Sequence, residues 1–160
     1  MAHYRASLDI QQPREDVFAY LSDFSTAREW DPGVVEAERV NGQAVGEGTE
    51  FRLVAEFLGR KNELTYRIVE YDPPRAVTFL GENATVISRD RITFESTPAG
   101  TRVTYDADLA LTGLLRFADP VLALAFNRVG DRALVGLRCT LAPRSRRDLA
   151  HCPDGPSKRS

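Results

Sequence analysis

Apolar and polar residues alternate along residues 100–111, and the pattern then changes to helical spacing. One face of this extended segment is apolar and comprises Val103, Tyr105, Ala107, Leu109 and Leu111. After Gly113, apolar residues recur every three or four positions, and Asp119 followed by Pro120 is typical of a helix start. The change of period predicts a strand followed by a long helix over about residues 119–141.

The same alternation marks six further runs, which are the remaining strands of the predicted sheet. They span about residues 4–11, 34–40, 49–58, 61–71, 75–80 and 84–95. Because short turns join most successive runs, they predict an antiparallel meander with one face toward the core and one toward solvent.

Two short helices are expected between the first two strands. The first spans about residues 13–22 and begins with Pro13 at the first helical position, where the fixed φ of proline suits a helix start. The second spans about residues 27–31, and Thr26 with Glu29 predicts a capping box at its N-terminus.

The composition is that of a soluble globular protein. The 160 residues fit one domain, 42% of them are apolar, and the net charge of −2 argues against a dedicated nucleic-acid binder. No signal-peptide core is apparent, and no apolar run approaches the roughly 18 residues of a membrane span. We therefore expect a cytoplasmic protein with one domain over residues 1–143 and a disordered polar tail over residues 144–160.

Four stretches of the chain resemble one superfamily. They are Pro13–Leu21, Glu29–Gly33, Gly48–Phe51 and Gly100–Tyr105. With the helix that follows, they resemble the START-like, Bet v 1-like helix-grip superfamily (SRPBCC), and more narrowly its polyketide cyclase/dehydrase branch, over about residues 3–142.

This resemblance implies an α+β helix-grip fold. A curved antiparallel sheet of about seven strands would wrap around the long C-terminal helix, with two short helices after the first strand. In this superfamily one architecture serves binding proteins, transporters, cyclases and hydrolases, so the resemblance does not specify a reaction.

Asp90 is the one acidic residue that the alternation places on the inner face, beside Val86 and Ile92. An ionised carboxylate is costly to bury there without a partner. Asp90 is therefore either a general acid/base or ligand anchor, or a structural residue paired with an arginine or with loop amides. Tyr66 and Tyr105 share this face, where their hydroxyls would either orient a ligand oxygen or reach water.

Small inner-face residues predict unfilled volume between the sheet and the last helix, although phenylalanine side chains are an alternative filling. Trp30 either lines the mouth of this cavity or packs the short helices against the sheet. The expected ligand-binding residues are Trp30, Phe51, Leu53, Phe57, Tyr66, Val86, Ser88, Asp90, Tyr105, Ala107, Phe117 and Ala125.

Three functions from different classes fit these features. The first is binding of a small hydrophobic ligand, lipid- or polyketide-like. The second is a polyketide cyclase/dehydratase-type enzyme that uses Asp90, Tyr66 or Tyr105, and the third is a protein-interaction module. Only one acid and no histidine are expected on the inner face, and proton transfer usually needs more than one such group. Ligand binding therefore ranks first.

Few partners are expected besides that ligand. No spacing of histidine, cysteine and carboxylate residues is typical of a metal site, and no cofactor is expected. We expect a monomer or homodimer, with neither nucleic acid nor an integral membrane segment.

Overall fold

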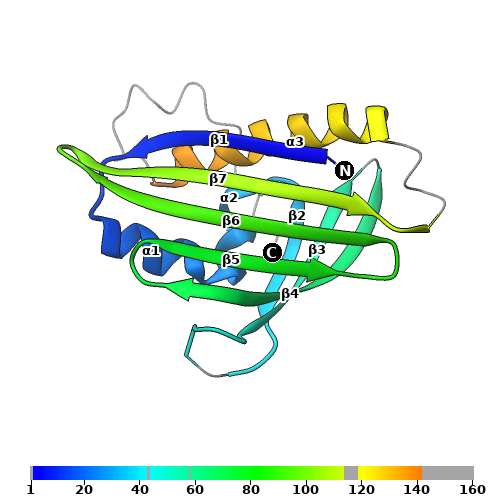
Figure 1. Cartoon of the computed structure of the whole chain (residues 1–160), viewed down its shortest axis with the longest axis horizontal. Helices are drawn as coiled ribbons and strands as arrows, with labels where there is room; N and C mark the ends of the chain where they lie inside the picture. Colours follow the sequence, from blue (N-terminus) through cyan, green and yellow to red (C-terminus); the bar gives the residue numbers. More distant parts are fainter. Residues whose placement is uncertain (1, 43, 58, 114–118, 142–160) are drawn as a thin grey trace, which may run out of the picture.

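A computed structural model describes residues 2–42, 44–57, 59–113 and 119–141 of the chain. Within these residues one antiparallel sheet of seven strands has the order β1-β7-β6-β5-β4-β3-β2 (Figure 1). The strands are β1 (Ala2–Ile10), β2 (Val34–Arg39), β3 (Glu50–Phe57), β4 (Arg60–Asp72), β5 (Ala76–Glu82), β6 (Val86–Thr97) and β7 (Gly100–Leu111).

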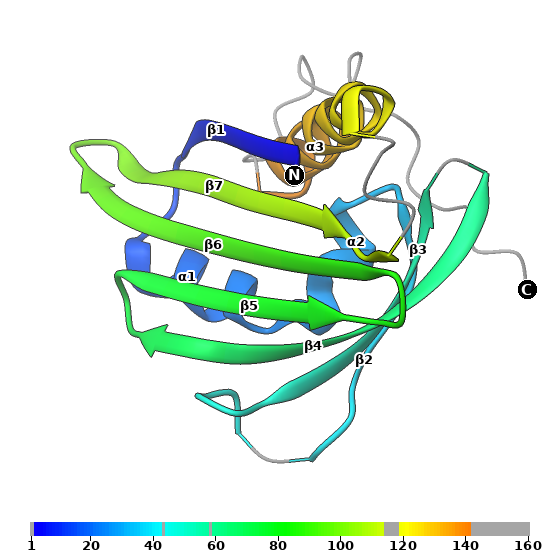
Figure 2. The same cartoon turned by 45° about the vertical axis from the view of Figure 1, so that its right-hand side comes forward.

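The helices lie on one side of this curved sheet. They are α1 (Arg14–Ser22), α2 (Ala27–Trp30) and α3 (Asp119–Leu141), and the short 3₁₀ turn η1 (Phe24–Thr26) precedes α2. Figure 2 shows α1 and α2 inside the curve of the sheet and α3 along the edge formed by β1. The prediction of a curved antiparallel sheet with two short helices and a long C-terminal helix is confirmed.

The apolar core fills the part of the inner face that α1 covers. Val17 and Leu21 of α1 are completely buried, and so is Phe79 of β5. Phe24 of η1 stacks on Phe79 with ring centroids 4.2 Å apart. Complete burial of one such side chain contributes roughly 1.5–3 kcal/mol to the stability of the fold. These contacts therefore hold α1 and η1 against the sheet.

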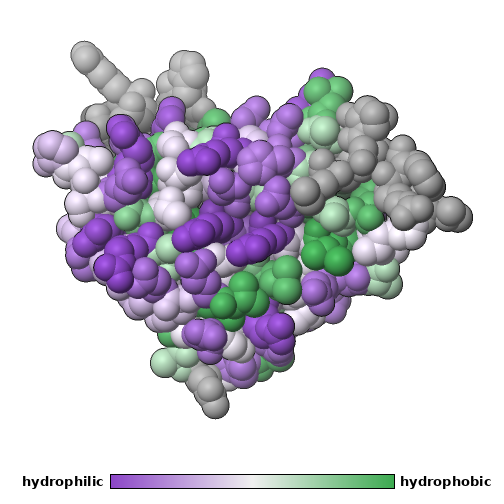
Figure 3. Space-filling view, in the orientation of Figure 1, coloured by the Kyte–Doolittle hydropathy of each residue, from purple (hydrophilic) through white to green (hydrophobic). Residues whose placement is uncertain are grey.

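The outer face of the sheet is polar, unlike the inner face. Strand residues alternate in exposure, and the face seen in Figure 3 is largely hydrophilic over its central strands. Arg52 on this face interacts with three carboxylates, those of Glu36, Glu38 and Glu63. The alternation read from the sequence therefore separates a solvated face from a core face.

The capping of both short helices differs from the prediction, although α2 begins at Ala27 as predicted. Pro13 precedes α1 as its N-cap, with φ −57° and ψ 145°, so the helix begins one residue later. The capping box does not form, because Thr26 ends η1 with helical dihedral angles and its hydroxyl donates to the carbonyl of Tyr20. Glu29 instead accepts a hydrogen bond from the hydroxyl of Tyr20.

Close contacts place α3 against β1 and α2. The Tyr4 hydroxyl of β1 donates to Asp131 of α3 at 3.0 Å. A Cβ atom at Gly136 would lie 1.9 Å from the Trp30 carbonyl oxygen, so only glycine permits this approach of α3 to α2. Leu137 of α3 is buried, whereas Leu124 of the same helix is 57% exposed.

No helix of the described segments is long and apolar enough to cross a membrane. The polar tail predicted for residues 144–160 lies outside the described residues, so that expectation stays a prediction.

Candidate functional site

A cavity of about 570 Å³ occupies the part of the inner face that α1 does not cover. Its walls come mainly from α2, from strands β3, β4, β6 and β7 and from the inward side of α3, and its surface is mostly apolar. Among the residues predicted from the sequence, the lining contains Trp30, Leu53, Phe57, Tyr66, Val86, Ser88, Asp90, Tyr105 and Ala107.

Two of the predicted lining residues lie elsewhere. Phe51 is completely buried in the core, where its ring is edge-on to Phe24, because its position on β3 falls under η1. Ala125 lines a neighbouring outer pocket instead of the cavity. Phe117 lies outside the described residues.

Asp90 lies at the centre of the polar part of the cavity wall. It sits on β6 opposite Ala107 of β7, its side chain is buried, and Ser88 Oγ donates to its Oδ1 at 3.0 Å. Burial raises the pKa of Asp90 from 3.8 to about 7, although the hydroxyls of Ser88, Tyr105 and Tyr66 offset part of this effect. A carboxyl with this pKa can either donate or accept a proton near neutral pH.

No ion pair with an arginine is found for Asp90 among the described residues, so the structural pairing considered above is not observed. Its neighbours are hydroxyl groups instead.

Tyr66 and Tyr105 flank Asp90. Burial and the nearby Asp90 carboxylate raise the pKa of both phenols well above 10, so both hydroxyls stay protonated and can donate hydrogen bonds. The Tyr66 ring lies over Gly81 of the adjacent strand, where an added Cβ would be 2.4 Å from Cε1 of the ring. Gly81 therefore provides the space that Tyr66 occupies.

The cavity wall contains a second acid, Asp31, which the sequence analysis did not place there. Asp31 directly follows α2, and its Oδ1 accepts a hydrogen bond from Gly33 N at 2.8 Å. Burial raises the pKa of Asp31 to about 6, and its charge in turn raises the pKa of Asp90. Strand alternation could not reveal Asp31, because it lies in the turn between α2 and β2 and belongs to no strand face.

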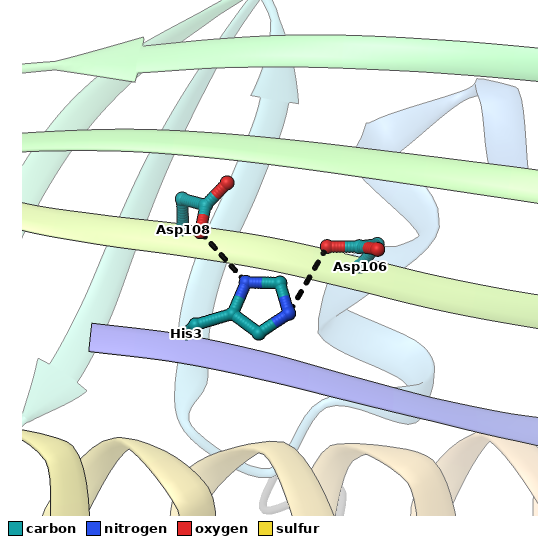
Figure 4. Close-up of side chains that lie close together, drawn as sticks. All are labelled: His3, Asp106 and Asp108. Atoms are coloured by element: carbon teal, nitrogen blue, oxygen red, sulfur yellow. Dashed lines mark hydrogen bonds and ion pairs between the residues drawn. The ribbon is translucent and has the colours of Figure 1, made fainter. Parts of the chain in front are cut away.

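One group of side chains within the described ranges has the spacing of a metal site. His3, Asp106 and Asp108 present ligand atoms within 4.8 Å of one another on the outer face of the sheet (Figure 4). His3 Nδ1 lies 2.7 Å from Asp108 and Nε2 lies 3.7 Å from Asp106, so the two ring nitrogens face different carboxylates. This geometry is that of a polar bridge between β1 and β7, remote from the cavity, and it gives no support for a metal ion.

The arrangement as a whole combines an apolar cavity with one polar region. The apolar walls can enclose a hydrophobic body, and the hydroxyl and carboxyl groups can form hydrogen bonds with one ligand oxygen. The two acids also provide proton donors and acceptors in the same wall.

Comparison with known proteins finds one matching family and a related sequence. The profile of the family described as "Polyketide cyclase / dehydrase and lipid transport" matches residues 1–142. An uncharacterised protein of Mycobacterium tuberculosis, present in two strains, is 30% identical over 84 residues. That match spans 51% of this chain and 57% of the relative.

Solved structures share the fold at lower identity. The protein TTHA0849 from Thermus thermophilus aligns with a TM-score of 0.74 and 21% identity over 87% of this chain and 96% of that one. A START superfamily protein from Mycobacterium smegmatis aligns with a TM-score of 0.73 and 13% identity over the same shares. The Zhui aromatase/cyclase from a Streptomyces species aligns with a TM-score of 0.68 and 16% identity, over 87% of this chain and 90% of that one.

Proposed function

Because the chain belongs to the polyketide cyclase/dehydrase and lipid transport family, we propose that it binds a small hydrophobic molecule, lipid- or polyketide-like, in the cavity between the sheet and α3. The observation that carries this proposal is the cavity itself. Its volume of about 570 Å³ falls within the range of roughly 300–1,000 Å³ that is typical of sites for small molecules.

Small side chains keep this volume open. Ala55 and Ala107 line the cavity and extend little from the sheet. Larger residues at these positions would fill the space that a ligand needs.

The polar region would select and orient the ligand. Tyr66 and Tyr105 donate hydrogen bonds, and Asp90 donates or accepts according to its protonation. A carbonyl or hydroxyl oxygen on the ligand matches this set. A ligand without such an oxygen would gain no hydrogen bond from this region and would bind more weakly.

Filling the cavity tests the proposal. Ala107→Phe should abolish binding while the protein stays folded, because the added ring enters open space. Trp30 is the single tryptophan and lines the cavity, so its fluorescence reports titration with decanol. Native mass spectrometry of the purified protein would also detect a small molecule that co-purifies.

Ala110→Phe is the matched control, because Ala110 lies on the same strand but outside the cavity lining. Equal binding by the wild type and Ala107→Phe would mean that the cavity is not the binding site. Loss of binding in both variants would point to general disruption of β7.

A second candidate function is a cyclase or dehydratase, and the pair of acids favours it. Asp31 and Asp90 have raised pKa values near 6 and 7, so one can be ionised as a base while the other is protonated as an acid. A polyketide-like thioester that loses water in the presence of the protein, but not of Asp90→Asn, would support this candidate. Binding of the thioester without any change in its mass would favour the binding function alone.

For the third hypothesis, an interaction module, the part of the chain that the structure describes offers no comparable observation. It would require an exposed apolar patch in place of an internal cavity.

A further inference from the structure

An outer pocket of about 410 Å³ adjoins the cavity. The two hollows share Asp31, Gly33, Glu56, Phe57 and Val129 in their walls. A ligand too long for the cavity could therefore extend into the outer pocket without crossing the core.

The outer pocket has two arginines on its helical side. Arg128 and Arg132 are one turn apart on α3, both are exposed, and both line the outer pocket. Neither makes an ion pair with any described residue. Arg102 on the outer face of the sheet, by contrast, forms an ion pair, since its guanidinium lies 3.0 Å from the Asp9 carboxylate.

The opposite wall of the outer pocket carries Glu56 and Asp31. Glu56 is exposed to solvent, and Asp31 lies at the boundary with the cavity. An anion in the outer pocket would therefore lie on the side of α3, between the two guanidinium groups. Guanidinium groups bind carboxylate and phosphate oxygens through paired hydrogen bonds, which a lysine or a neutral group cannot reproduce.

We propose that the outer pocket binds the anionic head of the ligand, with Arg128 and Arg132 holding a carboxylate or phosphate while the apolar body occupies the cavity. The inference rests on the proposed binding function and defines the ligand class as an anionic amphiphile. The polar region around Asp90 would then contact an oxygen farther along the same molecule.

Four probes with the same alkyl chain test this inference: decanoate, decyl phosphate, decanol and decylammonium. Each is titrated into the full chain below its micelle concentration, and Trp30 fluorescence reports binding. We expect decanoate or decyl phosphate to bind at least tenfold more tightly than decanol, and decylammonium to bind most weakly. The better of the two anions identifies the head group as carboxylate or phosphate.

The double variant Arg128→Gln/Arg132→Gln should remove the preference for the anion and leave decanol binding unchanged. Arg138→Gln is the matched control, because Arg138 is exposed on the same helix and lies outside both pockets. The control should keep the preference. Melting temperatures of the three proteins check that the fold is intact.

The possible failures can be told apart. Equal binding of decanoate, decyl phosphate and decanol would overturn the head-group site but leave the cavity function standing. Tighter binding of decylammonium would also overturn it and would assign the outer pocket to Glu56 and Asp31. An anion preference that survives the double variant would place the head group elsewhere, and the absence of binding by every probe would overturn both proposals.

Discussion

Replacing Asp90 by asparagine should make the protein more stable at neutral and alkaline pH. The folded-state pKa of Asp90 is about 7, above its ordinary value of 3.8, because the carboxyl is buried. The folded protein therefore holds this proton more tightly than the unfolded chain does. Its stability must fall as the pH rises from about 4 to about 7, and the full penalty is present above that range.

The size of the penalty follows from the same two values. A pKa raised from 3.8 to about 7 corresponds to about 4 kcal/mol, at about 1.36 kcal/mol per pH unit. Asparagine cannot ionise, yet its side-chain oxygen can still accept the hydrogen bond from Ser88. We expect the variant to gain up to about 4 kcal/mol at pH 8 and to match the wild type within about 1 kcal/mol near pH 4.

Urea denaturation between pH 4 and pH 8 measures this difference directly. Glu95→Gln is the matched control, because Glu95 lies on the same strand but is exposed on the outer face. Its stability should follow the wild-type curve. A loss of about 3 kcal/mol in Asp90→Asn at pH 8 would refute the reasoning, since that result is typical of a broken buried ion pair.

Asp31 provides an internal check on this prediction. Its charge contributes to the raised pKa of Asp90, so Asp31→Asn should lower that pKa. In the Asp31→Asn background, the stability difference between the proteins with Asp90 and with Asp90→Asn should therefore level off at a lower pH and be smaller at pH 8. An unchanged profile would mean that the two carboxyl groups are not coupled.

Two further substitutions test how the site is held in place. Gly81→Ala should destabilise the fold by about 1–3 kcal/mol because its Cβ would overlap the Tyr66 ring, and the loss should largely disappear in a Tyr66→Ala background, as measured by urea denaturation. A loss that persists there would show that the backbone at Gly81, and not the ring, is the obstacle. Tyr4→Phe should cost about 1 kcal/mol by removing the hydrogen bond to Asp131 that joins β1 to α3, and unchanged stability would mean that this bond makes no net contribution.

The strands and α3 were predictable because their signals are periodic and local. The alternation along residues 100–111 matches β7, and the bounds predicted for the last helix match α3. The two short helices were found as elements, but α1 begins one residue later than predicted and the capping box of α2 does not form. Thr26 shows why, since its hydroxyl bonds to a carbonyl six residues earlier and not to its own helix.

The same reasoning explains what could be predicted of the site. Alternation assigns a face, and it placed Asp90, Tyr66 and Tyr105 together on the inner one. It does not say which end of a strand lies beneath a helix, so Phe51 was predicted to line the cavity although η1 covers it. Asp31 was not predicted to line the cavity, because residues in a turn follow no periodic pattern that assigns them to a face.

A purely structural role does not explain Asp90, because its buried carboxyl destabilises the fold. It has no arginine partner among the described residues, and its raised pKa lowers the stability of the folded protein at neutral pH. Asparagine would keep the hydrogen bond to Ser88 without this cost. A buried carboxyl beside phenol donors in the wall of a cavity is therefore better explained by what enters the cavity than by folding. A ligand oxygen that accepts the Asp90 proton in a hydrogen bond would stabilise the protonated form and raise its pKa further. Saturating ligand should thus shift the stability profile of the wild type toward higher pH, and that of Asp90→Asn should not shift.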